Sequence, residues 1–336
     1  MDARITKERL NRMLSYDWLK IVGFCLVAII VWTLVFTMSA TRITAAQQFT
    51  VINYSGNVST INTKMSKSLS DAFNKKVFSY EVIEVSEVDV GGNDEYASTL
   101  METRMTTAEG DVIFAPDIVA KDYGYKFNGE TVYDSYIQRL VRLYGYDLMN
   151  LDPEDEDGYF KGLERYLNRY YSGDYMNGEL NDAAVRVDFL ARIKDNKDKR
   201  FKKEAQIEQG LLDECARIEK YRAGLIEFYG YCDLGVVQFE KMTILDYENG
   251  GKVLRDGIYS INVCPDRSKM PDLVDIAAYL QEVEGEDGQT QNVLSADNMH
   301  VAFCNFEEVE KGFEYESLLY LNHVIRLSIA EDLLVA

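Results

Sequence analysis

An acidic loop between two helical stretches contains the residue types of a calcium site. Within residues 153–164 (PEDEDGYFKGLE), Asp155, Asp157 and Glu164 stand at positions 3, 5 and 12 of the EF-hand loop pattern. Carboxylate oxygens at these positions are the ligands that Ca²⁺ prefers. Pro153, however, occupies position 1, where an Asp ligand belongs. The loop therefore has two interpretations: a weak Ca²⁺ site, or an acidic helix–helix turn that places carboxylates at a helix N-terminus.

A second group of polar residues follows two strands that the sequence predicts in the first half of the chain. Ligands of open α/β sheets bind beyond the carboxyl ends of the strands. Asn and Ser side chains both donate and accept hydrogen bonds, and a Tyr ring offers a stacking surface. Asn, Ser and Gly are also the residues that a turn needs for backbone reasons alone. The ligand-binding candidates are Asn53, Tyr54, Ser55 and Asn57 after the first strand, and Pro116 and Asp117 after the third.

Catalytic chemistry finds little support. His300 and His323 are the two histidines of the chain, and a lone histidine on a strand or helix is usually structural. The sequence contains no G-x-S-x-G, H-E-x-x-H or C-x-x-C motif and no phosphate-binding glycine loop. We therefore expect a protein that is not an enzyme.

Alternating strand and helix patterns must position these candidates. Residues 48–54 and 80–90 are rich in aromatic and β-branched types and end at Gly and Asn, and residues 111–115 (DVIFA) end at a proline, so all three predict strands. Between them, residues 64–76 and 96–107 repeat apolar residues at helical spacing. This β-α-β-α-β order predicts parallel strands with right-handed crossovers.

The remainder of the chain is predicted to be helical in the middle and mixed at the end. Apolar stripes predict helices between residues 133 and 231. Strands are then predicted at 236–245, 257–264 and 300–306, and helices at 272–282 and 315–334.

Residues 49–117 resemble the opening of the extracellular solute-binding proteins of bacterial ABC importers. The segments that carry the resemblance are a helix ending in AFNKK, the strand EVIEV, and the run YASTLMETRMTTAEGDVIFAPD. The later segment GIYSINVCPDRSKMPDLVDIAAYL is similar to the stretch in which that family's chain crosses back to its first lobe. The resemblance implies a bilobed type II periplasmic-binding fold and a small-molecule ligand held between the lobes without chemistry.

An uncharged apolar run, residues 21–38, precedes all of these elements. Lys20 and Arg42 bracket 21 residues without a charge, and as a helix these would be about 31 Å long, which matches a bilayer's hydrocarbon core. Residues 1–20 carry five basic and three acidic residues, which leaves −22 for the remaining 316 residues of a chain with net charge −20. By the positive-inside rule the N-terminus is cytoplasmic and the rest is outside. A cleavable signal peptide is the alternative.

These observations together predict an α/β ectodomain, preceded by one transmembrane helix. We expect a parallel-sheet first lobe and a helix-rich second lobe inserted into it. So acidic an ectodomain excludes nucleic acid as a partner. The expected segments are a cytoplasmic tail (1–20), a transmembrane helix (21–41), lobe 1 (47–120 plus 265–336) and lobe 2 (121–264).

Three further features bear on partners. Eleven of the 23 tyrosines lie between Tyr123 and Tyr175, and an exposed cluster would suit a glycan or a protein. Residues 194–203 (KDNKDKRFKK) are a basic island, either a contact for anionic wall polymers or a solvated helix connection. Cysteines 215, 232, 264 and 304 lie where disulfides could form, or serve as small buried hydrophobes.

Two functions follow from the sequence. The first is a single-pass, outward-facing receptor of a bacterial cell membrane that resembles solute-binding proteins and binds a small ligand in an interlobe cleft. The alternative is an envelope assembly protein that keeps a degenerate binding-protein fold and uses a tyrosine-rich helical face against another protein.

Overall fold

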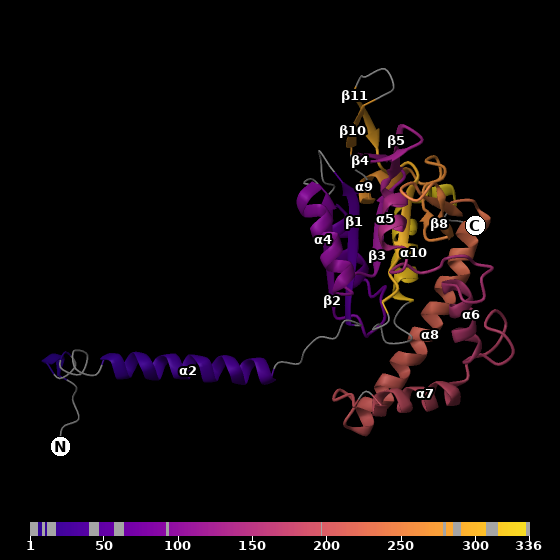
Figure 1. The fold of residues 1–336 in the computed structure, drawn as a ribbon. Coiled ribbons are helices and arrows are strands. Elements are labelled where there is room, and N and C mark those ends of the chain that lie inside the picture. The colour runs from indigo at the N-terminus through magenta and orange to yellow at the C-terminus, as the bar shows by residue number, and fades with distance from the viewer. Residues whose placement is uncertain are drawn as a thin grey trace. The chain divides into compact units, whose positions relative to one another are not determined.

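The computed structural model describes residues 6–8, 11, 18–39, 47–56, 64–91, 94–195, 197–277, 280–284, 290–306 and 315–333. The chain divides into two units, Met1–Thr44 and Ala45–Ala336. Figure 1 shows their elements. The described part is a mixed α/β protein with one N-terminal apolar helix.

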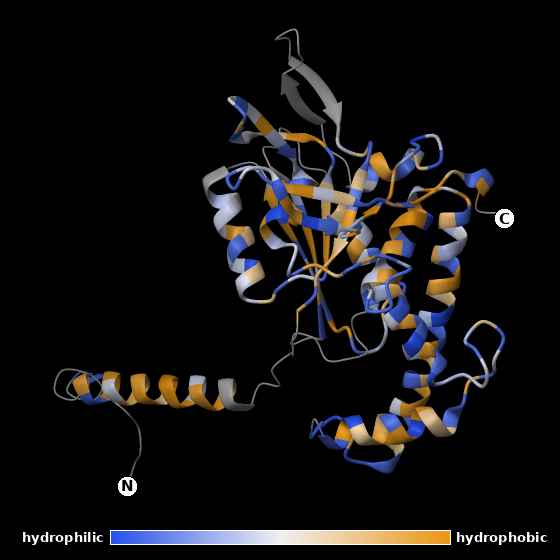
Figure 2. Cartoon of the chain, turned by 45° about the vertical axis from the view of Figure 1, so that its right-hand side comes forward, coloured by the Kyte–Doolittle hydropathy of each residue, from blue (hydrophilic) through white to orange (hydrophobic). Residues whose placement is uncertain are grey.

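The N-terminal unit contains helix α2 (Trp18–Ser39). Its 19 residues from Trp18 to Phe36 have a mean hydropathy of 2.5, and none of this stretch is buried by other parts of the protein. Figure 2 shows hydrophobic residues along most of its length. The helix is therefore long and apolar enough to cross a membrane, a test that a signal sequence near the N-terminus also passes.

The second unit is built on a six-stranded sheet with the order β2-β1-β3-β12-β9-β6. β1 runs parallel to both β2 and β3, so the predicted parallel β-α-β-α-β segment is confirmed. β12 is antiparallel to β3 and β9, and β6 is antiparallel to β9. The strands are β1 (Gln48–Gly56), β2 (Glu84–Gly91), β3 (Val112–Pro116), β6 (Gln238–Phe239), β9 (Ile261–Asn262) and β12 (Met299–Phe303).

Successive strand residues point to opposite faces of a sheet. Both faces of this sheet carry apolar side chains, and helices cover both. Phe49, Val51 and Phe114 point to the face with α3 (Lys64–Asn74) and α10 (Glu316–Ser328). Ile52 and Ile113 point to the other face, with α4 (Asp94–Thr106) and α5 (Tyr136–Tyr144). Each face has its own apolar core.

A helical segment packs beside the first of these cores. It comprises α6 (Tyr159–Asn168), α7 (Asp182–Asp195) and the long α8 (Glu204–Asp233). α8 contacts α10, α7 and α6. The predicted helical middle is thus confirmed for these four helices, α5 to α8.

The remaining elements differ from the predictions in three places. The second strand begins at Glu84 instead of residue 80, because Ser79 donates its N–H to the buried Glu316 carboxylate. The predicted helix 272–282 ends early: η2 (Pro271–Leu273) and α9 (Val274–Ala277) precede a strand. The structure also contains three antiparallel hairpins that the sequence did not predict as pairs of strands. They are β4 (Val119–Phe127) with β5 (Glu130–Ser135), β7 (Met242–Asp246) with β8 (Lys252–Gly257), and β10 (Leu280–Glu284) with β11 (Thr290–Leu294). A short 3-10 helix, η3 (Glu331–Leu333), follows α10.

The sheet continues across the predicted boundary between the lobes. β6 and β9 come from residues assigned to the second lobe, yet they lie in the same sheet as β1, β2 and β3. α5 also comes from that segment and packs on this sheet. Residues Ala45–Ala336 thus form one compact unit.

A partly buried carboxylate just before β3 makes the stability of this sheet dependent on pH. Asp111 Oδ2 accepts a hydrogen bond from Thr50 N at 2.7 Å. Burial, with a contribution from nearby Glu316, raises the pKa of Asp111 from 3.8 to about 7. A carboxyl group with a raised folded pKa stabilises the fold fully below pH 3.8, and that contribution is lost as pH rises to about 7.

We therefore expect Asp111→Asn to flatten the pH dependence of stability. Relative to this variant, the wild-type free energy of unfolding should fall by about 2–4 kcal/mol between pH 4 and pH 7.5. Denaturant unfolding of the full chain in detergent measures it, with the exposed Asp272→Asn as the control. Equal slopes for wild type and Asp111→Asn would contradict the assignment.

Candidate functional site

The carboxyl ends of β1, β2 and β3 form an edge of the sheet, called the carboxyl edge below. Asn53 on β1 pairs with Asp89 on β2 and with Phe114 on β3. Asp117 follows β3, and its backbone N–H donates to Asn298 O at 3.1 Å. The structure therefore brings the predicted residues Asn53 and Asp117 to the same edge, on the adjacent strands β1 and β3.

A buried histidine occupies the next position along this edge. His300 on β12 is 1% exposed and pairs with Ala115 on β3 and Asn262 on β9. Its Nδ1 lies 3.0 Å from Ser260 Oγ, and its Nε2 lies 3.5 Å from a Glu240 carboxylate oxygen.

Asn262 joins this histidine to the turn beside Asp117. Its Nδ2 donates to Glu240 Oε1 at 2.8 Å and to Asn298 Oδ1 at 3.2 Å. The polar groups from β6, β9, β12 and the end of β3 are therefore connected. Ser260 is fully buried, so its hydroxyl positions the imidazole and does not face solvent.

The side chain of Asn53 at this edge has an unsatisfied hydrogen-bond acceptor. It is 8% exposed, and its Oδ1 is buried without a hydrogen-bond partner among the residues that the structure describes. A buried acceptor left unpaired costs about 1–3 kcal/mol. A ligand that donates a hydrogen bond to this atom would recover part of that cost.

The other predicted ligand residues lie elsewhere or outside the described part. Tyr54 is 4% exposed and packs edge-on against Tyr136 with ring centroids 6.1 Å apart, so its ring belongs to the core. Ser55 lies within β1, but its side chain is not described, and Asn57 lies outside the described residues. Asp117 is exposed.

Sequence reasoning missed the histidine cluster. His300 was interpreted as structural, and nothing in the local pattern links it to Ser260 or Glu240. These residues lie 40 and 60 positions away in the chain, and the sheet order that joins them has no local sequence signal.

The acidic loop of residues 153–164 adopts a turn held by its own side chains. Asp155 Oδ2 accepts from Asn150 Nδ2 at 2.7 Å, and its Oδ1 accepts from Asp157 N at 2.9 Å. Glu164 instead accepts from Tyr229 OH at 3.1 Å and Lys161 Nζ at 3.1 Å. Within the described ranges, no three His, Cys, Asp or Glu side chains come together as a metal site, so the expected calcium ligands are not assembled.

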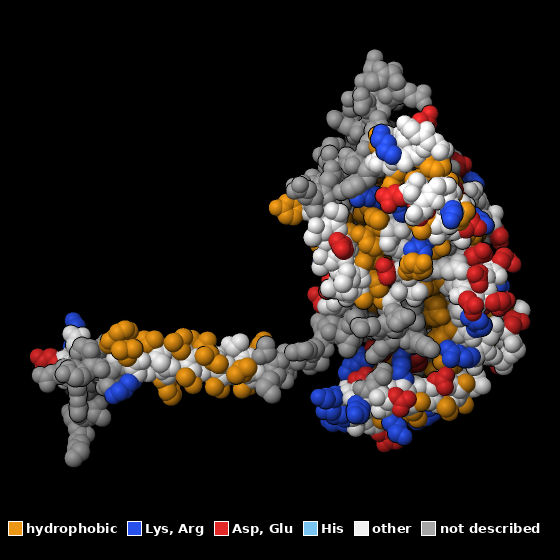
Figure 3. All heavy atoms as spheres, viewed as in Figure 1, with side chains coloured by type: hydrophobic (Ala, Val, Ile, Leu, Met, Phe, Trp, Pro, Cys, Tyr) orange, Lys and Arg blue, Asp and Glu red, His pale blue; other side chains and the backbone are white. Residues whose placement is uncertain are grey.

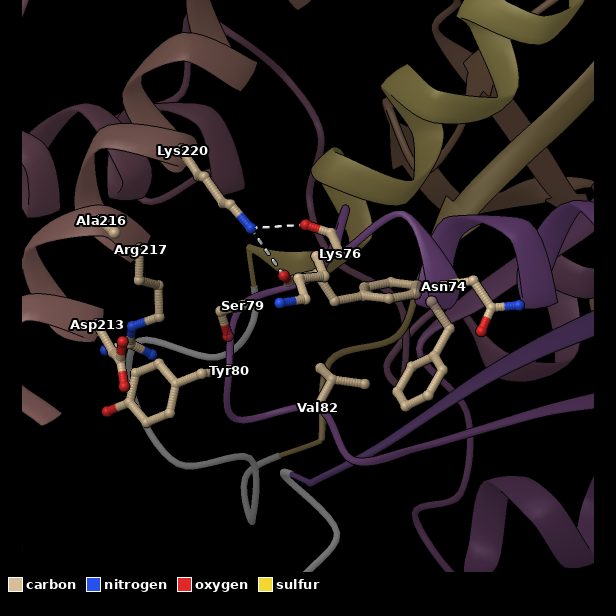
Figure 4. Close-up of a pocket in the computed structure, with 11 residues that line it drawn as sticks. Asn74, Lys76, Ser79, Tyr80, Val82, Asp213, Ala216, Arg217 and Lys220 are labelled. Carbon is tan, nitrogen blue, oxygen red and sulfur yellow. Dashed lines mark hydrogen bonds between the residues drawn. The ribbon is translucent and has the colours of Figure 1, made fainter. Parts of the chain in front are cut away.

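A pocket of about 530 Å³ opens between α8 and the segment that follows α3 (Figure 4). Phe73, Phe78 and Val82 supply apolar walls, and Lys76 and Arg217 supply positive charge. Lys220 Nζ donates to the carbonyl oxygens of Lys76 and Phe78, at 2.7 and 3.0 Å. The Lys220 ammonium group thus binds the protein itself, and these contacts join α8 to the segment that follows α3.

Buried charges lie behind this pocket. Glu214 pairs with Arg217 and with Arg192, the latter at 2.7 Å, and Glu81 pairs with Arg200 at 2.7 Å. Glu81, Glu214 and Arg217 are all buried. Breaking a buried pair costs about 3–5 kcal/mol, because the partner left behind is uncompensated. These contacts fix the position of α7 and α8.

The tyrosines of the helical segment are mainly core residues. Tyr159, Tyr166, Tyr170, Tyr171 and Tyr175 are all buried. Their rings pack against one another and against the end of α10, as in the Tyr166–Tyr170 pair with centroids 5.2 Å apart. A contact face on these helices would therefore consist of other side chains.

All five cysteines lie in the described part of the chain, and none forms a disulfide. Cys264 and Cys304 are buried. The buried-hydrophobe interpretation holds for these two residues.

No protein-family model, curated protein or solved structure matches the chain.

The histidine cluster predicts a loss of stability in acid. Burial lowers the pKa of His300, against the opposing effect of the Glu240 and Asp117 carboxylates. A histidine with a depressed folded pKa contributes fully above the unfolded pKa of 6.5, and the contribution is lost as pH falls below it. His300→Gln should therefore lose less stability than wild type between pH 7.5 and 5.5.

Melting temperatures of the full chain at these two pH values measure the difference. Gln209→Asn, an exposed substitution on α8, is the control and should behave as wild type. If the melting temperature of His300→Gln fell by as much as that of wild type between pH 7.5 and 5.5, the assignment would be wrong.

Proposed function

We propose that the protein is a membrane-tethered, outward-facing receptor that binds a small solute at the carboxyl edge without chemistry. In this proposal α2 is retained as a single-pass anchor in a bacterial cell membrane, with the N-terminus cytoplasmic. The observation that carries the proposal is the buried, unpartnered Asn53 Oδ1 among the described residues, at the edge where ligands of open α/β sheets bind.

Three carboxylates at this edge indicate the chemical class of the solute. Asp117 is exposed, Asp89 pairs in register with Asn53, and Glu240 is about two-fifths exposed. Carboxylate oxygens only accept hydrogen bonds when ionised. The solute would therefore be rich in donors, either a cationic amine or a polyol.

The finer arrangement implied by the resemblance to solute-binding proteins also belongs to this proposal. Residues 121–264 would form a second lobe that closes over the ligand, and an ABC permease would receive it. β9, which comes from that segment, lies in the main sheet. The site at the carboxyl edge does not itself require two lobes.

Two substitutions test the site. Asn53→Leu removes the buried unpaired acceptor, so it should stabilise the unliganded protein by about 1 kcal/mol and abolish ligand binding. Asp117→Asn should leave the unliganded stability within about 0.5 kcal/mol and weaken binding at least about tenfold.

The measurement is thermal unfolding of the full chain against a panel of amines, amino acids, sugars and polyols. A bound solute at 100 times its dissociation constant should add about 2.7 kcal/mol to wild type. Glu219→Gln, an exposed carboxylate on α8, is the matched control and should keep that gain. A gain that survives both Asn53→Leu and Asp117→Asn would place the ligand elsewhere.

The second candidate function is an envelope assembly protein that binds no solute. It is favoured by the single compact unit Ala45–Ala336, because closure of two lobes over a ligand needs two bodies that move. A flat ligand panel from a well-folded wild type, with cross-linking to one partner protein in cells, would favour this function over the receptor.

A further inference from the structure

The connection between α7 and α8 is a basic tip on an acidic unit. Residues 194–203, called the basic tip below, contain six basic and two acidic residues, whereas the chain after residue 20 carries −22. Five lysines of the tip are exposed and form no ion pair with another described residue. They are Lys194, Lys197, Lys199, Lys202 and Lys203. Figure 3 shows Lys and Arg side chains gathered at this end of the unit.

Packing holds the basic tip in one place. The Phe201 ring lies against Phe189 of α7, with centroids 5.2 Å apart. Gly210 of α8 lets both rings approach, because a Cβ there would lie 2.4 Å from Phe201 and 2.7 Å from Phe189. Arg200 pairs with Glu81 at 2.7 Å and with Asp198 at 2.7 Å. The lysines therefore project from a fixed loop.

The basic tip is also close to the point where the chain enters this unit. Arg200 contacts Glu81, and two residues further on Ile83 donates its N–H to Gln47 O at 2.9 Å. Gln47 is eight residues beyond Ser39, the last residue of α2. Eight residues span at most about 28 Å. A membrane that holds α2 is therefore within reach of the tip.

We propose that the basic tip docks on the anionic lipid headgroups of the membrane that holds α2. The proposal rests on the retained anchor of the proposed function. Each lysine near an anionic surface adds to the attraction, while the acidic remainder of the unit is repelled. The tip thereby fixes which end of the unit faces the lipid.

The test uses the full chain in nanodiscs and the rate of tryptic cleavage at Lys194 and Arg200. Discs of phosphatidylcholine alone are compared with discs containing 30% phosphatidylglycerol, at 50 mM and 500 mM NaCl. Cleavage at the exposed Lys252 on β8 is the internal reference. Tip cleavage relative to Lys252 should slow at least fivefold in anionic discs at low salt. It should recover to within twofold at high salt, where charges are screened within a few ångströms.

The variant Lys197→Gln/Lys199→Gln/Lys202→Gln should lose this protection and keep both cleavage sites. A control that removes three lysines elsewhere, Lys67→Gln/Lys126→Gln/Lys241→Gln, should keep it.

Four outcomes overturn the proposal. The first is equal protection in both lipids, and the second is protection that salt does not reverse. The third is that added polyglycerol phosphate slows tip cleavage in neutral discs, whereas anionic discs alone do not slow it. The partner would then be a wall polymer. Loss of the chain from the discs in a 1 M salt wash shows that α2 is no anchor, and with it the docking proposal falls. Solute binding by the same sample is a separate readout, so the receptor proposal fails or stands independently.

Discussion

A single buried carboxylate, Glu316, joins the parts of the second unit. It is 3% exposed, opens α10, and accepts hydrogen bonds from Ser79 N at 3.0 Å and Tyr221 OH at 2.8 Å. Burial raises the pKa of this group, and the two donors oppose that effect. A buried carboxylate is tolerated only with such partners, so the segment after α3, helix α8 and helix α10 must meet there. The sheet and the helical segment depend on this meeting point.

The same requirement places the basic tip. Glu81 and Glu214 are buried and need cations, which Arg200 and Arg192 supply from α7 and the tip. The Arg200–Glu81 ion pair holds the end of the α7–α8 pair beside the segment that hydrogen-bonds to Gln47 through Ile83. The exposed lysines of the basic tip lie at the end of this pair. Their position follows from charges buried underneath them.

Local patterns predicted the elements whose cores are made by neighbouring segments. The aromatic and β-branched residues of β1 and the helical spacing of Met65, Leu69 and Phe73 predicted a strand followed by a helix. The β-α-β-α-β order along the chain then predicted parallel strands. Local patterns also predicted a strand over residues 257–264, which contains the two-residue β9, but they predicted the end of a helix at residues 280–282, where the structure forms β10. The candidate site divides likewise: Asn53 and Asp117 follow from strand ends, whereas His300 meets its partners through long-range pairing that has no local periodicity.

Strand direction connects the proposed site with the proposed docking surface. β1 begins at Gln48, next to the point where the chain enters the unit, and reaches the carboxyl edge near Asn53. At about 3.3 Å per residue its nine residues cover about 30 Å, so the carboxyl edge lies about that far from the point where the chain enters the unit. If the tip holds the amino ends of β1 and β2 toward the lipid, the carboxyl edge faces away from it. An acidic edge held away from an anionic surface is open to cationic and donor-rich solutes from outside.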